Sequence, residues 1–254
     1  MGTFAPRPWT WLAVLAAVCA CTSPPPAEPP STPPVAAPPK PYLAALQTAG
    51  VTVPPSGKFI LVNIPAFALV AFQDGAPVLR SRVVVGKPET PTPELETSLY
   101  AVTFNPSWTP TPAMRRFEGA RFAPPGPANP LGQVLFALDN DALIFMHDTN
   151  DRSYFARAQR ALSHGCVRVQ EARALAAWAL DMSAGEISAL VRSGVTRSLP
   201  LASPIAVSLV YRTRFPEEEG GVTVYPDIYG LVPKEATRHA PSGACRQALG
   251  ESAA

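Results

Sequence analysis

The sequence predicts a mainly β fold with flanking helices. Short apolar runs of strand length, separated by turn residues, begin at Lys58 and recur as far as Tyr225. The longest helical periodicity of apolar residues is confined to 172–194. The chain has 254 residues, of which 47% are hydrophobic, so it can build one core of moderate size.

The first strands are predicted to form an antiparallel meander. Pro65 separates two apolar runs, and Gln73-Asp74-Gly75 is a hairpin pattern before the next run, which stops at Gly86. Because the turns are short, consecutive strands should pair with each other. The predicted strands of this part cover 59–64, 66–72, 78–85 and 98–104.

The middle of the chain is predicted to carry an irregular segment and then two strands. Residues 105–130 are Pro-rich, with a short helix predicted at 113–118. Strands are predicted at 132–138 and 142–146, and the second delivers His147 at its end. A strand end is where a rigid sheet presents a side chain to a cleft, so His147 is a candidate catalytic base.

Two helices follow this region. The first is predicted at 172–182, with Trp178 in the core, and Ser183 and Glu186 form a capping-box pattern that opens a second helix ending at Gly194. The last predicted strands are 205–212 and 222–225, joined across an acidic loop, 217–221. The tail, 233–254, is polar and is predicted to be disordered.

The N-terminus resembles an export signal. Residues 1–20 contain Arg7 and an apolar run from Trp9 to Ala20, which has the length of a signal-peptide core. Val18-Cys19-Ala20-Cys21 resembles a bacterial lipobox, which predicts lipidation of Cys21 and a membrane-anchored protein in the periplasm. An ordinary secretory signal and an uncleaved anchor remain alternatives. The chain holds 32 prolines, many of them in residues 21–57, which are predicted to form an extended linker.

Export changes the interpretation of the four cysteines. Cys19 would leave with the signal and Cys21 would carry lipid, so Cys166 and Cys245 remain for the mature protein. We expect Cys166 to be a free thiol, because Cys245 lies in the polar tail; a disulfide between them is the alternative.

The net charge argues against one class of partner, and the spacing of the His and Cys residues argues against a zinc site. The net charge of +2 and the lack of a basic tract argue against nucleic acid binding. The His-x-Cys spacing of His164 and Cys166, with one distant His, supplies neither a standard zinc ligand pattern nor a fourth donor. We therefore expect neither a metal nor a cofactor.

The sequence Ser163-His164-Gly165-Cys166-Val167-Arg168 carries the strongest chemical pattern. Fifteen residues separate His147 from Ser163, so a thiol and two imidazoles lie close together in the chain. An imidazole beside a thiol accepts its proton, and in such pairs the pKa of Cys falls from about 8.5 to below 7. Gly165 is expected to allow a tight turn whose amides face an oxyanion. Arg168 is expected either to bind a substrate carboxylate or to hold the turn.

This pattern resembles the YkuD-type L,D-transpeptidase catalytic domain, over about residues 58–232. Phe104-Asn105-Pro106-Ser107-Trp108, His147-Asp148-Thr149 and Asp227-Ile228-Tyr229-Gly230 are similar to the YcbB-like branch of Gram-negative cell envelopes. The resemblance implies a β-sandwich or barrel of mixed strands, with the His at a strand end and the Cys on a following turn. It also implies that residues 105–130 are a reduced cap over the active site.

The resemblance implies a role for each motif residue. Cys166 would be the nucleophile and His147 its general base, while Ser163, His164 and Gly165 would shape the oxyanion turn. The implied reaction is acyl transfer on peptidoglycan stem peptides, in which Cys166 attacks the L-centre carbonyl of diaminopimelate and expels D-alanine. An amine then resolves the thioester, and carbapenems are expected to acylate the same Cys. The alternatives are an L,D-carboxypeptidase that uses water and a non-catalytic peptidoglycan-binding lipoprotein.

Overall fold

The strands of the protein close into a barrel. The computed structural model describes residue 2 and residues 40–232; the predicted signal peptide, Cys21, Cys245 and the tail from 233 lie outside them. A nine-stranded sheet has the order β2-β1-β9-β4-β5-β6-β8-β3-β7, and β2 also pairs with β3, which closes the sheet. The prediction of a mainly β fold built from mixed strands is confirmed. Among the described residues, the strands are β1 (Lys58–Asn63), β2 (Ala68–Gln73), β3 (Ala76–Gly86), β4 (Leu95–Phe104), β5 (Val134–Leu138), β6 (Met146–His147), β7 (Ala161–Ser163), β8 (Val167–Val169), β9 (Arg197–Val210), β10 (Arg214–Pro216) and β11 (Val222–Val224).

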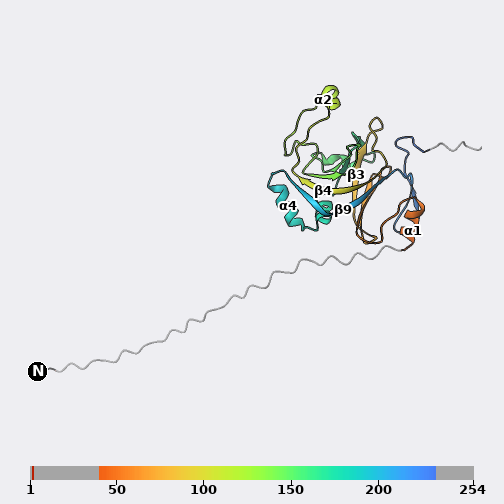
Figure 1. The fold of residues 1–254 in the computed structure, drawn as a ribbon, viewed down its shortest axis with the longest axis horizontal. Helices are drawn as coiled ribbons and strands as arrows, with labels where there is room; N and C mark the ends of the chain where they lie inside the picture. The colour runs from red at the N-terminus through yellow and green to blue at the C-terminus, as the bar shows by residue number, and fades with distance from the viewer. Residues whose placement is uncertain (1, 3–39, 233–254) are drawn as a thin grey trace, which may run out of the picture. The chain divides into compact units, whose positions relative to one another are not determined.

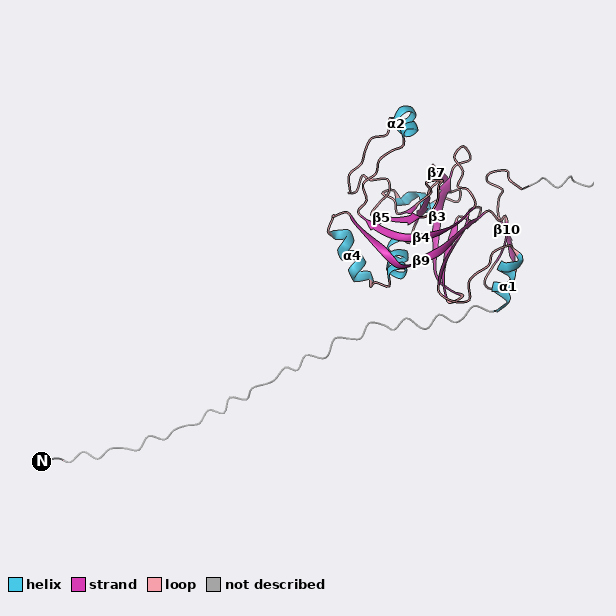
Figure 2. Ribbon diagram, in the orientation of Figure 1, coloured by secondary structure: helices cyan, strands magenta, loops and turns pink. Residues whose placement is uncertain are grey.

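Helices lie around these strands (Figure 2). They are α1 (Lys40–Thr48), α2 (Pro112–Glu118), α3 (Ala172–Leu180) and α4 (Ala184–Arg192), with a 3-10 helix at Arg152–Ala156. Ser183 and Glu186 form the predicted capping box at the start of α4. The helix α2 stands at the end of two long loop segments (Figure 1). In the described part of the chain, no single helix is long and apolar enough to cross a membrane, and α3 with α4 passes that test only as a pair bent by 116°.

The predicted meander is present, and both faces of its first strand are covered. The strand β1 pairs antiparallel with β2, which pairs antiparallel with β3 across the turn at Asp74 and Gly75. Ile60 and Val62 point into the main core, whereas Phe59 and Leu61 pack in a second cluster. Burial on both sides explains why this strand is a continuous apolar run instead of an alternating one.

The folded body begins before the predicted boundary at residue 58. In α1, Tyr42 and Leu46 are buried in the second cluster. The predicted linker, 21–57, therefore contains a helix that packs on the barrel.

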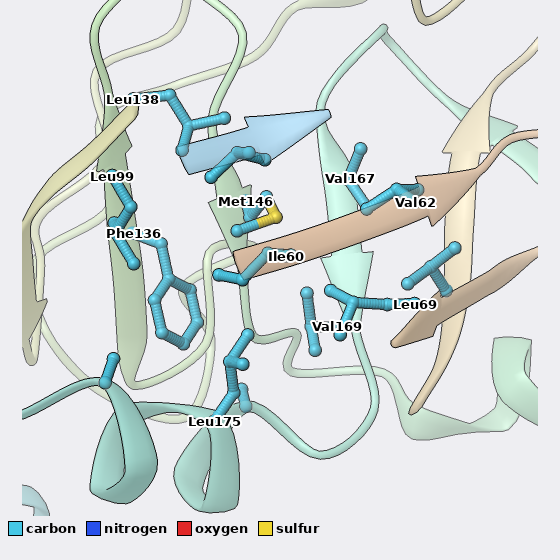
Figure 3. Close-up of a cluster of buried hydrophobic side chains, with 14 of the residues drawn as sticks. Ile60, Val62, Leu69, Leu99, Phe136, Leu138, Met146, Val167, Val169 and Leu175 are labelled. Carbon is cyan, nitrogen blue, oxygen red and sulfur yellow. The ribbon is translucent and has the colours of Figure 1, made fainter. Parts of the chain in front are cut away.

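The main core fills the barrel beneath β6, which ends at His147, and β8, which follows Cys166. Met146 and Val167 lie side by side in the register of these two strands, and both are buried in the core (Figure 3). Leu175 of α3 is buried in the same cluster (Figure 3). Because side chains alternate along a strand, the inward packing of Met146 turns His147 to the other side of the sheet.

Removing a core aromatic side chain tests this packing. Phe136 of β5 is fully buried, whereas Phe122 is 59% exposed. We expect Phe136→Ala to lower the free energy of unfolding by about 3–5 kcal/mol because it leaves a cavity. The measurement is urea unfolding, with Phe122→Ala as the matched control. Equal losses in the two variants would contradict the assignment of Phe136 to the core.

Candidate active site

His147 and Cys166 line one cleft. His147 ends β6, and Cys166 lies in the turn between β7 and β8. The strands β6 and β8 are parallel, with His147 opposite Arg168. The cleft has a volume of about 590 Å³ and is also lined by Ser163, His164 and Arg168. The predicted site residues of the motif, apart from Gly165, therefore all line this cleft.

The turn that presents Cys166 is held by Ser163. The Ser163 hydroxyl donates to the Cys166 carbonyl at 2.5 Å and accepts from the Gly165 amide at 3.2 Å. Gly165 has a φ of 109°, in the region that favours glycine. The Gly165 N–H donates to Ser163 inside the turn, and the expectation that amides of this turn face an oxyanion stays a prediction. Gly165 supplies the backbone conformation that the turn needs, as the expected tight turn requires.

The imidazole of His147 is oriented by the main chain. Its Nδ1 lies 2.5 Å from the carbonyl oxygen of Asp148. A carbonyl only accepts hydrogen bonds, so Nδ1 carries the proton and Nε2 carries the lone pair. Burial, reinforced by the positive charge of Arg168, lowers the pKa of His147 from 6.5 to about 4. The ring is therefore neutral near pH 7 and can accept a proton.

The thiol of Cys166 is protonated at rest. Burial raises its pKa above the ordinary value, although a backbone hydrogen bond from Phe145 and the charge of Arg168 act in the opposite direction. The expectation of a lowered thiol pKa is therefore wrong, because a neutral, buried imidazole provides no charge to offset the burial of the sulfur. The pair rests as thiol and imidazole, and Cys166 is a free thiol.

Arg168 carries an unused hydrogen-bond donor. Its guanidinium stacks over the Tyr154 ring at 4.9 Å from the centroid. Within residues 40–232, its Nε is buried and meets no hydrogen-bond partner. A buried donor without a partner is costly to stability. Arg168 also lines the cleft, so its side chain is placed to contact a bound group.

His164 faces the predicted cap. Its Nε2 lies 2.9 Å from a carboxylate oxygen of Glu118, the last residue of α2. Trp108, Met114 and Glu118 line the same cleft as Cys166. Residues of the 105–130 segment thus form one wall of the cleft, and His164 joins that wall to the nucleophile turn.

Three contributors to the site had no pattern in the sequence. The Asp148 carbonyl that orients His147 is a main-chain group, so its residue type carries no information. Glu118 lies 46 residues before His164, and the stacking partner Tyr154 could equally have been a surface residue. Only the position of Asp148, directly after a candidate base at a strand end, could have indicated its role.

Comparison with known proteins gives a consistent result. The family model described as YkuD, L,D-transpeptidase catalytic domain, matches residues 57–196, more than half of the 254-residue chain. A protein of Haemophilus influenzae named "Putative L,D-transpeptidase" is 29% identical over 218 residues, which cover 67% of this chain and 44% of that protein. The chain therefore spans less than half of the length of this relative.

Solved structures are also similar to this chain. An L,D-transpeptidase from Mycobacterium smegmatis is 19% identical, covers 59% of this chain and 58% of its own, and gives a TM-score of 0.36. An L,D-transpeptidase (Yku) from Stackebrandtia nassauensis is 14% identical, covers 62% of this chain and 57% of its own, and also gives a TM-score of 0.36.

Proposed function

Because this chain belongs to the YkuD family of L,D-transpeptidase catalytic domains, we propose that it is a cysteine-dependent L,D-transpeptidase acting on peptidoglycan tetrapeptide stems. The observation that carries the proposal is the shared cleft of Cys166 and His147, with the His147 tautomer fixed by Asp148. A thiol and a neutral imidazole in one cleft are the groups that thioester chemistry requires.

In the proposed first half-reaction, His147 acts as general base. As the sulfur of Cys166 attacks the L-centre carbonyl of diaminopimelate, the thiol proton moves to Nε2 of His147. Collapse of the tetrahedral intermediate breaks the bond to D-alanine, whose nitrogen takes that proton. The product is a thioester on Cys166 and free D-alanine.

In the second half-reaction, an amine of another stem peptide attacks the thioester. Its proton passes to His147, the carbon–sulfur bond breaks, and the sulfur recovers a proton. Arg168 is proposed to bind a substrate carboxylate, because it lines the cleft and its guanidinium is positively charged. The segment 105–130 is proposed to act as a cap, because its residues line the cleft. Carbapenems, as strained acyl donors, are proposed to acylate Cys166.

Incubation of the purified protein with a disaccharide-tetrapeptide tests this function. A cross-linked dimer with released D-alanine is the expected product. Tripeptide without dimer would replace the proposal by an L,D-carboxypeptidase, in which water resolves the thioester. No release of D-alanine would overturn both activities and favour a non-catalytic peptidoglycan-binding protein.

We also propose that the protein is exported and anchored through a lipid on Cys21, in the periplasm. The support is the pattern of an apolar run followed by Val18-Cys19-Ala20-Cys21. Labelled palmitate fed to expressing cells should be incorporated into the protein and into the Cys19→Ala variant, but not into Cys21→Ala. Label retained in Cys21→Ala would contradict lipidation at this position.

A further inference from the structure

The segment Asp227-Ile228-Tyr229-Gly230 lies far from Cys166 in the sequence. It contacts the loop between β3 and β4, which supports the turn that carries Cys166. The ring of Tyr229 stacks on Tyr211 of the residues after β9, with 5.3 Å between the ring centroids. The Tyr211 hydroxyl donates to the carboxylate of Asp227 at 2.6 Å and accepts from the Tyr229 amide at 2.8 Å. These contacts fix the position of the Tyr229 ring on the barrel.

The hydroxyl of Tyr229 binds both ends of the loop between β3 and β4. It donates to the carbonyl of Gly86 at 2.6 Å and accepts from the amide of Thr92 at 3.2 Å. Gly86 and Thr92 approach so closely that a Cβ on Gly86 would lie 2.6 Å from the amide nitrogen of Thr92. The loop is therefore closed tightly, with Tyr229 at its neck.

This closed loop supports the turn that carries Cys166. The Thr92 hydroxyl is buried; it accepts from the Gly86 amide at 2.8 Å and donates to the carbonyl of Gly165 at 2.7 Å. The carbonyl of Ser163 accepts from the Lys87 amide at 2.9 Å. The loop thus holds the turn on both sides of His164, directly before the nucleophile.

We propose that Tyr229 and Thr92 are positioning residues for the nucleophile, linked as Tyr229 to Thr92 to the Gly165 carbonyl. Gly165 is the most permissive residue of the turn, so fixing its carbonyl limits the positions that the Cys166 sulfur can occupy. Misplacement of a reacting atom by about 1 Å costs on the order of 10²-fold in rate. Neither side chain lines the cleft, so both act through the turn and touch no substrate.

Because a positioning role rests on the proposed function, the test combines an activity-independent measurement with a kinetic one. The variants are Tyr229→Phe and Thr92→Val, which remove one hydroxyl each, and Thr92→Ser, which keeps it. Tyr225→Phe is the matched control, since its hydroxyl binds Glu217 near the β10–β11 hairpin at 3.0 Å. Hydrogen exchange is followed in a peptide spanning 161–169, and the first-order rate constant of Cys166 acylation by meropenem is measured per titrated thiol at saturation.

Faster exchange in 161–169, together with a loss of about tenfold or more in the acylation rate constant, is expected for Tyr229→Phe and Thr92→Val. Thr92→Ser and Tyr225→Phe should behave like the wild type, and the half-saturating meropenem concentration should change by less than about twofold. A purely structural role would instead lower the fraction of titratable thiol and leave the rate constant per thiol unchanged. That result, or unchanged exchange in 161–169, would overturn the proposal.

If Tyr229→Phe does not fold, the comparison of Thr92→Val with Thr92→Ser decides the question alone. A wild-type protein that forms no acyl product would overturn the proposed function. The exchange measurement would then decide alone whether Tyr229 and Thr92 hold the turn at 161–169 in place.

Discussion

Replacing Cys166 by alanine is expected to lower D-alanine release from a tetrapeptide stem by at least about 10³-fold, because no other group in the cleft can form the thioester. Among the residues that the structure describes, Cys166 is the free cysteine, and it lines the cleft together with His147. The measurement is the initial rate of D-alanine release by a coupled assay. Cys245→Ala is the matched control and should keep the wild-type rate.

The structural effect of this change should be small. Alanine removes only the sulfur, so the melting temperature of Cys166→Ala should stay within a few degrees of the wild type. A residual rate above about 1% of the wild type in a folded Cys166→Ala protein would contradict a cysteine nucleophile.

Replacing His147 by glutamine is expected to lower the acylation rate by about 10²–10⁴-fold, because the thiol then has no base to accept its proton. The raised pKa of Cys166 strengthens this expectation, since a resting thiol depends on proton removal during attack. His164→Gln should have a smaller effect, because its imidazole is engaged with Glu118. A larger loss in His164→Gln than in His147→Gln would reverse the assignment of the base.

The lowered pKa of His147 also predicts a pH dependence of activity. The pKa is lowered to about 4, chiefly by burial. Below this pH the imidazole is protonated and cannot act as a base, so kcat/KM should fall as the pH drops through about 4. A midpoint near 6.5 in the acid limb would mean that His147 is not buried in the working enzyme.

The same group makes stability depend on pH. Between about pH 6.5 and pH 4 the unfolded state binds the His147 proton and the folded state does not, so stability decreases as the pH falls through this window. The difference between a pKa of 6.5 in the unfolded state and one of about 4 in the folded state corresponds to roughly 3 kcal/mol. Wild type should lose about this much more stability than His147→Gln between pH 7 and pH 4. Identical losses in urea unfolding would show that His147 titrates normally in the folded protein.

Much of the barrel could be predicted because its signals are local. The hairpin at Asp74 and Gly75 has both residues at positive φ, as its sequence indicates, and the capping box of α4 is present. The strand β9 begins at Arg197, eight residues before the predicted start. The prediction started late because Pro200 and Pro204 argue against a strand. The structure tolerates Pro200 at an irregularity of the pairing between β4 and β9.

The strand before His147 is shorter than predicted for a similar reason. Only Met146 and His147 are paired, because Leu143 adopts a φ of 55° in a turn that the apolar run 142–146 did not indicate. The last strand pair also differs from the prediction, since β11 pairs with β10 instead of with the strand that ends at residue 210.

In the site, residue types were predictable but their electrostatics were not. Cys166 and His147 stand out by spacing alone. The pKa of each depends on burial and on Arg168, which are properties of the folded chain, so the direction for Cys166 was predicted wrongly. The link from Tyr229 to the nucleophile turn spans distant parts of the chain and left no local pattern. Assignment to the YcbB-like branch stays a prediction.

The most direct test of a cysteine acyl-enzyme is mass spectrometry of the protein after exposure to meropenem. Cleavage after Arg160 and Arg168 by trypsin isolates the peptide 161–168, which contains Cys166. The predicted result is one covalent adduct, located on Cys166 in this peptide. An unmodified 161–168 peptide from folded protein, or an adduct on another residue, would contradict Cys166 as the nucleophile.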